Sequence, residues 1–203
     1  MNERWEPFDE HGADASPFVQ FRAWFDEARS VMADRETVAL ATSTPDGHPS
    51  ARMVLLRHVD ERTLGWYTNY QSRKGRELEA NAHAALLWYC EPLGRQVRVE
   101  GLVATMSAER SDAYFAQRAR GHQIGAYASA QSAIIPDRAF LEHAVEHAER
   151  EFAGLDVPRP PYWGGYEMAP STFEFFQQRH DRLHDRVLYT REHDDWVRAR
   201  QSP

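Results

Sequence analysis

The segment from His180 to Arg186, with the sequence His-Asp-Arg-Leu-His-Asp-Arg, holds the most unusual arrangement of ionisable side chains in the chain. In an extended conformation alternate side chains share a face, which would then carry His180, Arg182, His184 and Arg186. Such a face could bind an anion, or it could be a solvated strand whose arginines pair with neighbouring aspartates. In a helix the two histidines would have the spacing of a metal-binding pair, but no third ligand lies nearby, so no metal site is expected.

A second group of cations lies at a predicted helix start. Ser72 can cap a short helix whose first residues include Arg73, Lys74 and Arg76. Free backbone amides and the helix dipole favour an anion at that end, and a phosphate would bind well there. An ordinary capped helix is the alternative, but cations are electrostatically unfavourable at a helix N-terminus. This conflict favours an anion-binding site.

The third candidate is the run Arg52-Met-Val-Leu-Leu-Arg57, an apolar strand with a cation at each end. Charge in a core strand requires a partner, and the two arginines differ in parity, so they are expected to point to opposite faces and meet different groups. By themselves, Gln131-Ser132 and Arg95-Gln96 are typical of a loop and a strand start. The aromatic residues between Trp163 and Phe176 are expected to pack in the core or an interface.

A β-rich first half is predicted to position these residues. Strands are expected over 37–43, 50–58, 63–68, 84–89 and 96–105, joined by short turns such as Pro45-Asp46-Gly47. Before them, apolar residues from Phe18 to Ala28 recur at helical spacing, and Pro17 is expected to begin that helix. Residues 1–16 are expected to form a mobile arm, with Trp5 and Phe8 suggesting a lid over the site, followed by a single domain over 17–203.

The second half mixes helices and strands. A helix is expected from Ser107 through Arg118, and a longer one over about 136–152 with a buried stripe of Phe140, Leu141, Ala144, Val145 and Ala148. Further strands are expected over about 163–176, 186–190 and 196–200. Many short antiparallel strands with inserted helices favour an α+β fold, a β-barrel decorated by helices, over a doubly wound parallel sheet. No Gly-x-Gly-x-x-Gly follows a strand, which also disfavours a Rossmann fold.

Composition excludes several classes of protein. The formal net charge of −7 disfavours a nucleic-acid binder, because the field of the whole molecule would repel phosphate polymers. No run approaches the ~18 apolar residues of a membrane span, and the acidic start of the chain does not resemble a signal peptide. Cys90 is the single cysteine, so no internal disulfide can form. We expect a protein of the reducing cytoplasm, with neither nucleic acid nor membrane as a partner.

The motifs taken together resemble the pyridoxine (pyridoxamine) 5′-phosphate oxidase family, in the family's order and spacing. The resemblance extends from the helix at Pro17 to Pro203. It is carried by Arg52-Met-Val-Leu-Leu-Arg57, Trp66-Tyr-Thr-Asn69, Ser72-Arg-Lys74, Arg95-Gln-Val97, Gln123-Ile-Gly-Ala126, Gln131-Ser132, Trp163-Gly-Gly165 and Arg182-Leu-His-Asp-Arg186. The last of these motifs is far more specific than a lone glycine motif.

This resemblance implies a split β-barrel homodimer that binds FMN at the subunit interface, with half a site on each subunit. One subunit would hold FMN through the run Arg52, Met53, Val54, Leu55, Leu56 and Arg57, and through Tyr67, Thr68, Arg73, Lys74 and Gln96. The other subunit would contribute Gln131, Ser132, Phe176 and Arg186. The substrate phosphate would be bound by Arg57, Tyr114, Arg118 and His122, while Arg182, Leu183 and His184 would lie against the substrate ring.

The implied reaction is transfer of a hydride equivalent from the 4′-carbon of pyridoxine or pyridoxamine 5′-phosphate to the flavin, which gives pyridoxal 5′-phosphate. Molecular oxygen would then reoxidise the flavin and form hydrogen peroxide. Because the flavin carries the redox chemistry, the protein would supply mainly orientation and electrostatics. Arg182 would align the transferring hydrogen and His184 would hydrogen-bond the substrate, so these two are the predicted catalytic residues.

Three positions depart from the family pattern, all at or beside the predicted substrate site. Arg57 stands where lysine is usual, His122 where serine is usual, and Phe176 where tryptophan is usual. Arginine demands a bidentate fit, and histidine adds bulk and a titratable group. Two alternatives therefore remain: an FMN-dependent oxidase of another small heterocycle, as in phenazine biosynthesis, and a flavin- or pyridoxal-phosphate-binding protein without turnover.

Overall fold

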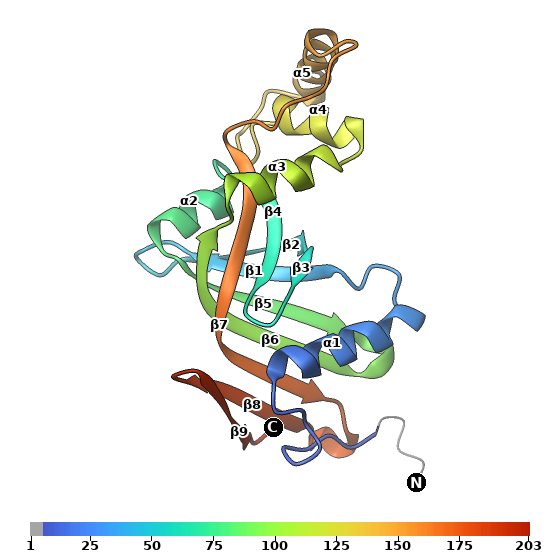
Figure 1. Cartoon of the computed structure of the whole chain (residues 1–203), viewed down its shortest axis with the longest axis vertical. Coiled ribbons are helices and arrows are strands. Elements are labelled where there is room, and N and C mark those ends of the chain that lie inside the picture. The colour runs from blue at the N-terminus through green and yellow to red at the C-terminus, as the bar shows by residue number, and fades with distance from the viewer. Residues whose placement is uncertain (1–5) are drawn as a thin grey trace.

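Apolar residues alternate with polar ones along short segments, and these segments pair into one curled antiparallel sheet (Figure 1). The computed structural model describes residues 6–203. The strands are β1 (Thr37–Ser43), β2 (Pro49–Leu55), β3 (His58–Val59), β4 (Leu64–Asn69), β5 (His83–Cys90), β6 (Arg95–Thr105), β7 (Trp163–Gln177), β8 (Asp185–Glu192) and β9 (Asp195–Arg200).

The strand order shows how the barrel is split. The sheet runs β2-β1-β5-β6-β7-β4-β3, and β8 and β9 extend it from the far half of β7. Curling brings β2 close to β4, but the two strands do not pair, so the barrel stays open along this seam. The predicted β-barrel with inserted helices is therefore confirmed.

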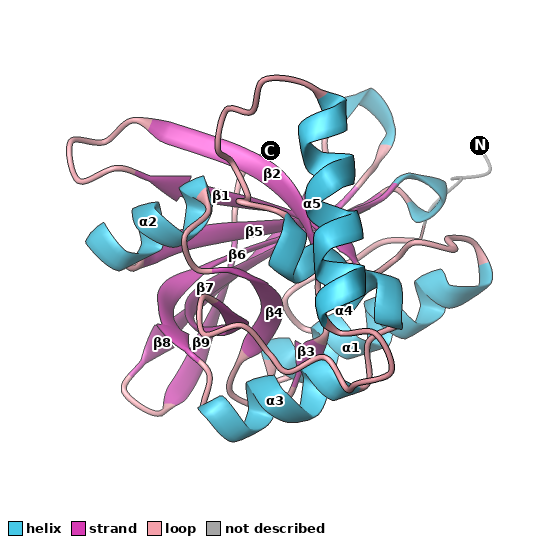
Figure 2. Ribbon diagram, turned by 90° about the horizontal axis from the view of Figure 1, so that it is seen from above, coloured by secondary structure: helices cyan, strands magenta, loops and turns pink. Residues whose placement is uncertain are grey.

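The helices lie mainly at two places around the sheet (Figures 1 and 2). They are α1 (Pro17–Glu27), α2 (Arg73–Ala80), α3 (Ala108–Ala116), α4 (Arg120–Ala128) and α5 (Arg138–Glu151), with short 3-10 turns η1 (Ala28–Ser30), η2 (Glu91–Leu93) and η3 (His180–Arg182). Helix α1 lies against the barrel, whereas α3, α4 and α5 gather at the opposite end of the molecule. Among the described residues no helix is both long and apolar enough to cross a bilayer.

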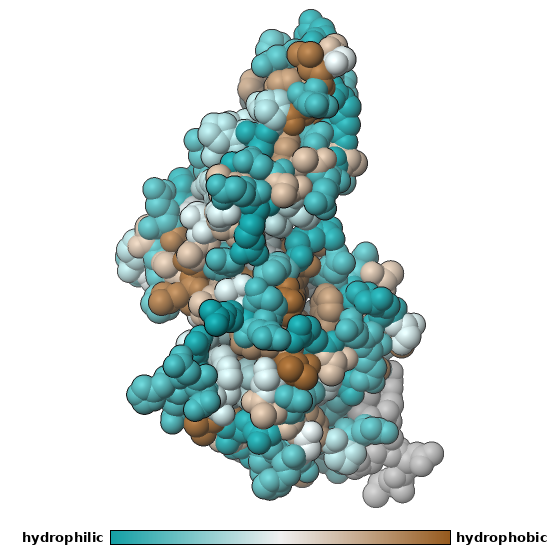
Figure 3. Space-filling model, viewed as in Figure 1, coloured by the Kyte–Doolittle hydropathy of each residue, from teal (hydrophilic) through white to brown (hydrophobic). Residues whose placement is uncertain are grey.

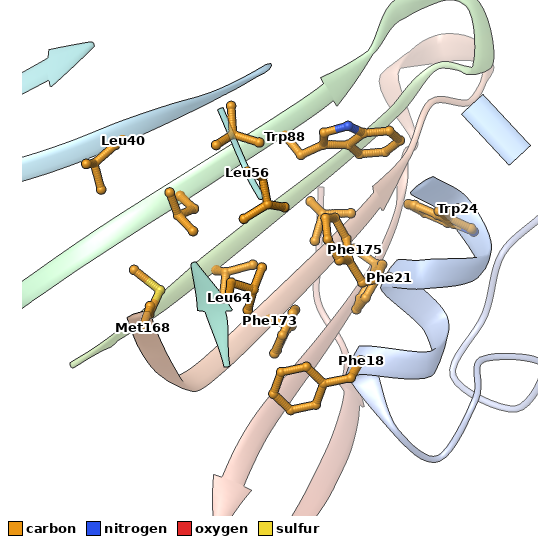
Figure 4. Close-up of a cluster of buried hydrophobic side chains, with 14 of the residues drawn as sticks. Phe18, Phe21, Trp24, Leu40, Leu56, Leu64, Trp88, Met168, Phe173 and Phe175 are labelled. Atoms are coloured by element: carbon orange, nitrogen blue, oxygen red, sulfur yellow. The ribbon is translucent and has the colours of Figure 1, made fainter. Parts of the chain in front are cut away.

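The main core lies between α1 and the sheet (Figure 4). Phe18 packs edge-on against Phe173, with ring centroids 5.1 Å apart, and Trp24 packs in the same way against Phe175 at 5.3 Å. Such aromatic pairs add about 0.5–1.5 kcal/mol each to the free energy of burial. At the start of α1 the Ser16 side chain accepts a hydrogen bond from the Val19 amide, so the predicted helix begins where Pro17 indicated.

The predicted strand over residues 50–58 is broken in two. β2 ends at Leu55, Leu56 turns into the core, and β3 begins at His58. The Arg57 amide donates to the Gly65 carbonyl at 2.8 Å, so this part of the chain crosses the seam to pair with β4. Arg52 and Arg57 were expected to point to opposite faces of one strand. That argument does not apply, because the two residues do not share a continuous strand.

The helix predicted from Ser107 through Arg118 ends earlier, at Ala116. Residues 120–128, for which no element was predicted, form α4. Helix α4 has glycines at positions 121 and 125 and no side-chain cap at Ala119, so it lacks the local signals that predict a helix.

The predicted stripe on α5 is mostly not buried. Ala148 is buried, but Phe140 is 53% exposed, because α5 packs mainly against α4 through its C-terminal half. Just before α5, the Ile134 side chain is fully exposed. Figure 3 shows apolar surface at this end of the molecule. Within a single chain this end therefore keeps an uncovered apolar face.

Residues 6–16 lie against the barrel. The Phe8 ring packs 4.8 Å from that of Trp24, Ala13 is buried, and the Tyr189 hydroxyl donates to the Asp14 carbonyl at 2.7 Å. Phe8 thus contacts α1 and the core. Trp5, the other residue of the suggested lid, lies outside the described residues.

Candidate functional site

A cavity of about 570 Å³ opens at the seam between β2, β4 and the helical end of the molecule. It gathers residues from distant parts of the chain: Arg52, Met53, Val54, Leu55, Arg57, Tyr67, Thr68, Lys74, Tyr114, Gln117, Arg118, Ala119, His122, Gln131 and Trp163. Most of these are predicted cofactor or substrate residues. A larger cavity, of about 760 Å³ beside α2, is lined by tyrosines and contains none of the predicted site residues. We therefore place the candidate site in the cavity at the seam.

Lys74 is buried at the inner wall of this cavity. Its Nζ donates to Thr68 Oγ1 at 3.1 Å, Ser72 Oγ at 3.2 Å and Gln131 Oε1 at 2.8 Å. All of these acceptors are neutral. Burial, together with the positive charge of Arg52, lowers the pKa of Lys74 to about 8. A buried ammonium without a carboxylate partner is stabilised by an anionic ligand.

The helix start that holds Lys74 is tightly built. Ser72 caps α2 by accepting from the Gly75 amide at 3.3 Å, as predicted. A Cβ at position 75 would lie 1.8 Å from the Tyr70 carbonyl oxygen, so only glycine allows the helix to approach the preceding loop this closely. The close fit fixes Lys74 and the amides of the first turn beside the cavity.

Arg52 reaches the same region from β2. Its NH1 donates to the Leu40 carbonyl at 3.1 Å and to Thr42 Oγ1 at 2.6 Å, and its NH2 lies 3.3 Å from Glu77 Oε2. Burial lowers the pKa of Arg52 despite the attraction of Glu77, and the nearby charge of Arg73 adds to the decrease. The guanidinium is thus held at the cavity wall by contacts on both terminal nitrogens.

A second cation, Arg118, lies at the helical side of the cavity. Its guanidinium carbon is 4.5 Å from the Trp163 ring centroid, a cation–π contact. Its NH1 is buried and has no hydrogen-bond partner among the described residues, and burial lowers its pKa. An arginine held by an aromatic ring with a donor left unpaired is suited to bind an anion.

Three stacked aromatic rings line part of this cavity. The Tyr67 and Tyr114 rings are parallel, with centroids 3.8 Å apart and an interplanar angle of 5°, and Trp163 lies parallel to both. We expected Trp163 to be packing only, but it also lines the cavity. Its place in the Trp163-Gly-Gly165 motif was the feature of the sequence that could have indicated a position at the site.

Arg57 and His122 also line the cavity, where the family resemblance placed them. The Arg57 guanidinium forms an ion pair with Glu36. His122 lies in the first turn of α4, three residues after Ala119, whose carbonyl accepts from its amide. Two of the three departures from the family pattern therefore share the cavity with Arg118.

Other predicted residues lie away from this cavity. Gln96, Phe176 and Arg186 are register partners across β6, β7 and β8, so they form one row on the sheet. Leu56 is buried in the core, Arg73 is bonded to Glu77 outside the cavity lining, and Ser132 has a left-handed φ of 71° in the loop after Gln131.

Within one chain, the predicted residues are grouped differently from the division that we expected between subunits. Gln131, expected to act with Phe176 and Arg186, contacts Lys74 and Thr68 of its own chain. Gln96, expected to act with Lys74, instead lies beside Phe176. Side-chain hydrogen bonds place Gln131 and strand register places Gln96, and neither can be read from the motifs.

The segment that carries the predicted catalytic residues is not extended. Residues 180–182 form η3, and Asp181 and Arg182 have left-handed φ values of 56° and 60°. The single face of alternating cations that an extended segment would present is therefore not formed, because β8 begins only at Asp185. Arg182 and Leu183 are exposed, whereas His184 is half-buried and accepts a hydrogen bond at Nδ1 from the Arg179 amide at 3.1 Å.

Arg186 is held firmly beside this turn. Its Nε and NH2 each lie 2.7 Å from Glu174 Oε1, and its NH1 donates to the Ser202 carbonyl at 2.8 Å. The His184 ring is 4.7 Å from the Phe176 ring. Arg186, Phe176 and His184 thus form a second group of predicted residues on the sheet surface near the C-terminus.

Family models match most of the chain. Residues 25–151 match the model described as pyridoxamine 5′-phosphate oxidase. Residues 163–203 match the model described as the pyridoxine 5′-phosphate oxidase C-terminal dimerisation region. The first match holds the cavity, apart from Trp163, and the second holds the group around Arg186.

Curated relatives are similar over nearly their whole length. The chain is 53% identical to a pyridoxine/pyridoxamine 5′-phosphate oxidase of Rubrobacter xylanophilus, covering 96% of this chain and 90% of that protein. It is 52% identical to the protein of the same name from Burkholderia lata, covering 96% and 92%.

Solved structures share the fold. The structure of PhzG from Burkholderia lata, in complex with tetrahydrophenazine-1-carboxylic acid, has a TM-score of 0.91 and 28% identity, covering 98% of this chain and 100% of that one. A pyridoxamine 5′-phosphate oxidase-related, FMN-binding protein from Nostoc punctiforme has a TM-score of 0.73 and 18% identity, covering 94% and 100%.

Proposed function

Because the chain belongs to the pyridoxine/pyridoxamine 5′-phosphate oxidase family, we propose that it is an FMN-dependent oxidase of pyridoxine or pyridoxamine 5′-phosphate. The product would be pyridoxal 5′-phosphate, with oxygen as the acceptor and hydrogen peroxide as the second product. The observation that carries this proposal is one cavity lined by two cations, the buried Lys74 and the half-buried Arg118 with its buried NH1, neither of which has an anionic partner among the described residues.

The residues around Lys74 fit the phosphate of FMN. A buried ammonium with neutral acceptors, the amides at the start of α2 and the Arg52 guanidinium converge on one region. The cavity volume lies within the usual range for small-molecule sites. Tyr67 and Thr68 would contact the cofactor beside Lys74, and bound FMN would supply the hydride acceptor.

Arg118 and its neighbours fit the phosphate of the substrate. Arg118, whose NH1 is unpaired, lines the cavity together with Arg57 and His122. A phosphate there would orient the pyridine ring of the substrate toward the cofactor region. Arg182 would then align the reacting carbon, and His184 would hydrogen-bond the substrate, so that neither needs to act as an obligate base.

A homodimer would complete the site, because the group around Arg186 lies outside the cavity lining of its own chain. The match of residues 163–203 to a dimerisation region supports this assembly. The exposed apolar surface formed by Met53, Leu55, Leu87, Tyr89 and Leu102 on β2, β5 and β6 gives a second copy a face to cover. Arg186, Phe176 and Ser132 would then reach the FMN of the partner.

A phenazine-type oxidase is the second candidate, supported by the fold similarity to PhzG and by the departures at Arg57 and His122. Two proteins of one species help to weigh the candidates. The chain is 52% identical to the Burkholderia lata pyridoxine/pyridoxamine 5′-phosphate oxidase but 28% identical to PhzG of that species. This difference favours the vitamin B6 substrate.

Peroxide release separates the candidates. The purified protein, loaded with FMN, is mixed with pyridoxamine 5′-phosphate, pyridoxine 5′-phosphate or a reduced phenazine carboxylic acid. Peroxide and pyridoxal 5′-phosphate from the first two substrates support the proposal. Oxidation of the phenazine compound alone supports the second candidate, and bound flavin without turnover of any substrate indicates a binding protein.

The affinity for FMN is expected to fall as the pH rises through about 8. The pKa of Lys74 in the free protein is about 8, and a phosphate dianion binds the protonated form, so above this pH part of the binding energy is spent on protonation. The dissociation constant is expected to rise by up to about tenfold per pH unit. Flavin fluorescence titrations between pH 7 and 9.5 measure this, with riboflavin as the phosphate-free control. An equal pH dependence for both flavins would contradict the role of Lys74.

Replacing Arg118 with methionine is expected to raise the KM for pyridoxamine 5′-phosphate by about tenfold or more, since a charged hydrogen bond contributes about 1.5–3 kcal/mol. The kcat value should change little, because the guanidinium would hold the phosphate and not the reacting carbon. Arg138→Met removes an exposed arginine of α5 as a control. A fall in kcat at unchanged KM would rule out the assigned role.

A further inference from the structure

Glu77 is a buried carboxylate at the centre of the cations that we assign to the FMN phosphate, and neither the motifs nor the comparisons give it a role. It lies on α2, four residues after Arg73. Its Oε1 accepts from Arg73 Nε at 2.8 Å, and its Oε2 accepts from Thr42 Oγ1 and Ser50 Oγ, each at 2.5 Å. Arg52 NH2 lies 3.3 Å from the same oxygen.

These contacts join three elements of the fold. Thr42 is on β1, Ser50 and Arg52 are on β2, and Thr42 and Ser50 are register partners. Arg73 lies at the start of α2. The phosphate-binding groups come from β2 and from α2, so their relative position depends on what connects these elements. Among the described residues, Glu77 makes side-chain contact with both.

Charge explains why a carboxylate lies beside an anion site. The positive charge of Arg73 lowers the pKa of Arg52, and that of Arg52 lowers the pKa of Lys74, so the cations repel one another. Burial disfavours the ionised form of Glu77, but hydrogen bonds from Ser50, Thr42 and Arg73 outweigh it and lower its pKa to about 2. Glu77 is therefore ionised at neutral pH and offsets part of this repulsion.

The contacts also leave donors free for a ligand. Arg73 uses its Nε for Glu77, while its terminal nitrogens have no partner among residues 6–203, and its side chain is 58% exposed. Lys74 makes no contact with Glu77 and keeps its charge toward the cavity. The carboxylate thus holds Arg73 through its Nε alone and Arg52 through NH2 alone, and it does not contact Lys74.

We propose that Glu77 is a positioning residue that sets Arg52 and Arg73 for the phosphate of FMN, an inference that rests on the proposed function. It acts through the two arginines and does not touch the cofactor. Its contribution is therefore specific to the phosphate group and does not extend to the isoalloxazine ring.

The test compares FMN with riboflavin, which lacks the phosphate. Fluorescence titration gives the dissociation constants of both flavins for the wild type, Glu77→Gln and Glu79→Gln. Glutamine keeps the size of the side chain but presents an amide donor to an arginine, so one arginine loses its anchor. We expect Glu77→Gln to weaken FMN binding by about tenfold or more and to leave riboflavin binding unchanged. Glu79→Gln removes an equal but exposed charge from the same helix and should affect neither flavin.

Each other outcome overturns the inference in a distinguishable way. Equal weakening of both flavins in Glu77→Gln would show general damage to the fold, and tighter FMN binding would show that Glu77 acts only as an unfavourable charge. If Glu77→Gln does not fold, Glu77→Asp gives the same comparison with the charge kept, and an unchanged preference for FMN would refute positioning. A wild type without preference for FMN over riboflavin would instead refute the proposed phosphate site.

Discussion

Replacing Lys74 with methionine is expected to yield a folded protein that purifies without flavin. Nζ of Lys74 is the buried cation of the proposed phosphate site, and its three hydrogen bonds go to neutral oxygens, so the anion is its missing partner. Loss of a charged donor in such a site costs about 3 kcal/mol, which corresponds to an increase of about 100-fold in the dissociation constant for FMN. Fluorescence titration of the flavin-free protein measures this increase.

Stability and a matched variant separate lost binding from lost folding. Burial lowers the pKa of Lys74, which means that folding disfavours its charged form, so the flavin-free variant should melt close to the flavin-free wild type. Arg76→Met removes an exposed cation from the same helix, outside the lining of the seam cavity, and should retain FMN. Wild-type affinity in Lys74→Met would refute the phosphate site. A large drop in melting temperature would assign Lys74 to the fold.

Replacing Arg182 with alanine is expected to lower kcat by about 100-fold while FMN stays bound. A preorganised charged donor beside the reacting atoms typically contributes 10²–10³ in rate, by order of magnitude. Arg182 is exposed, and its guanidinium has no partner among residues 6–203, so its charge is free to meet a substrate. Steady-state peroxide formation and the visible flavin spectrum measure turnover and loading in the same sample.

The backbone at Arg182 makes alanine the appropriate replacement. Its φ of 60° is left-handed, and both arginine and alanine carry the same Cβ in that conformation, so the substitution does not change the strain. Arg191→Ala, an exposed arginine on β8, is the matched control and should turn over normally. Normal turnover by flavin-loaded Arg182→Ala would remove this residue from the mechanism.

Local patterns predicted most of the elements around the site. Ser72 caps a helix and Pro17 begins one as expected, because a helix start depends on a few adjacent residues. The strands over 37–43 and 96–105 were predicted within a residue at each end, because alternation and turn residues are local signals. Helix α4 was missed because its glycines and uncapped start weaken those signals, and packing against α5 stabilises it instead.

The candidate site was predicted less completely than the fold. The motifs contain Arg52 and Lys74, and the family resemblance implied Arg118, but neither indicates Glu77, whose four donors come from three elements. The spacing of Arg73 and Glu77, four residues apart in a predicted helix, was the one local feature that could have indicated their ion pair. Neither of the two conformations considered for residues 180–186, extended or helical, anticipated the observed turn, because two left-handed residues are not visible in an alternating pattern.

Sequence alone therefore established the family, the antiparallel barrel and the cationic segments, since each depends on residue type and short spacing. The folded chain decided which of the predicted site residues lie together. Gln131 joins Lys74 across 57 positions of sequence, and Gln96 lies beside Phe176 through strand register. Contacts between residues so far apart depend on the path of the backbone through the barrel, which no local pattern specifies.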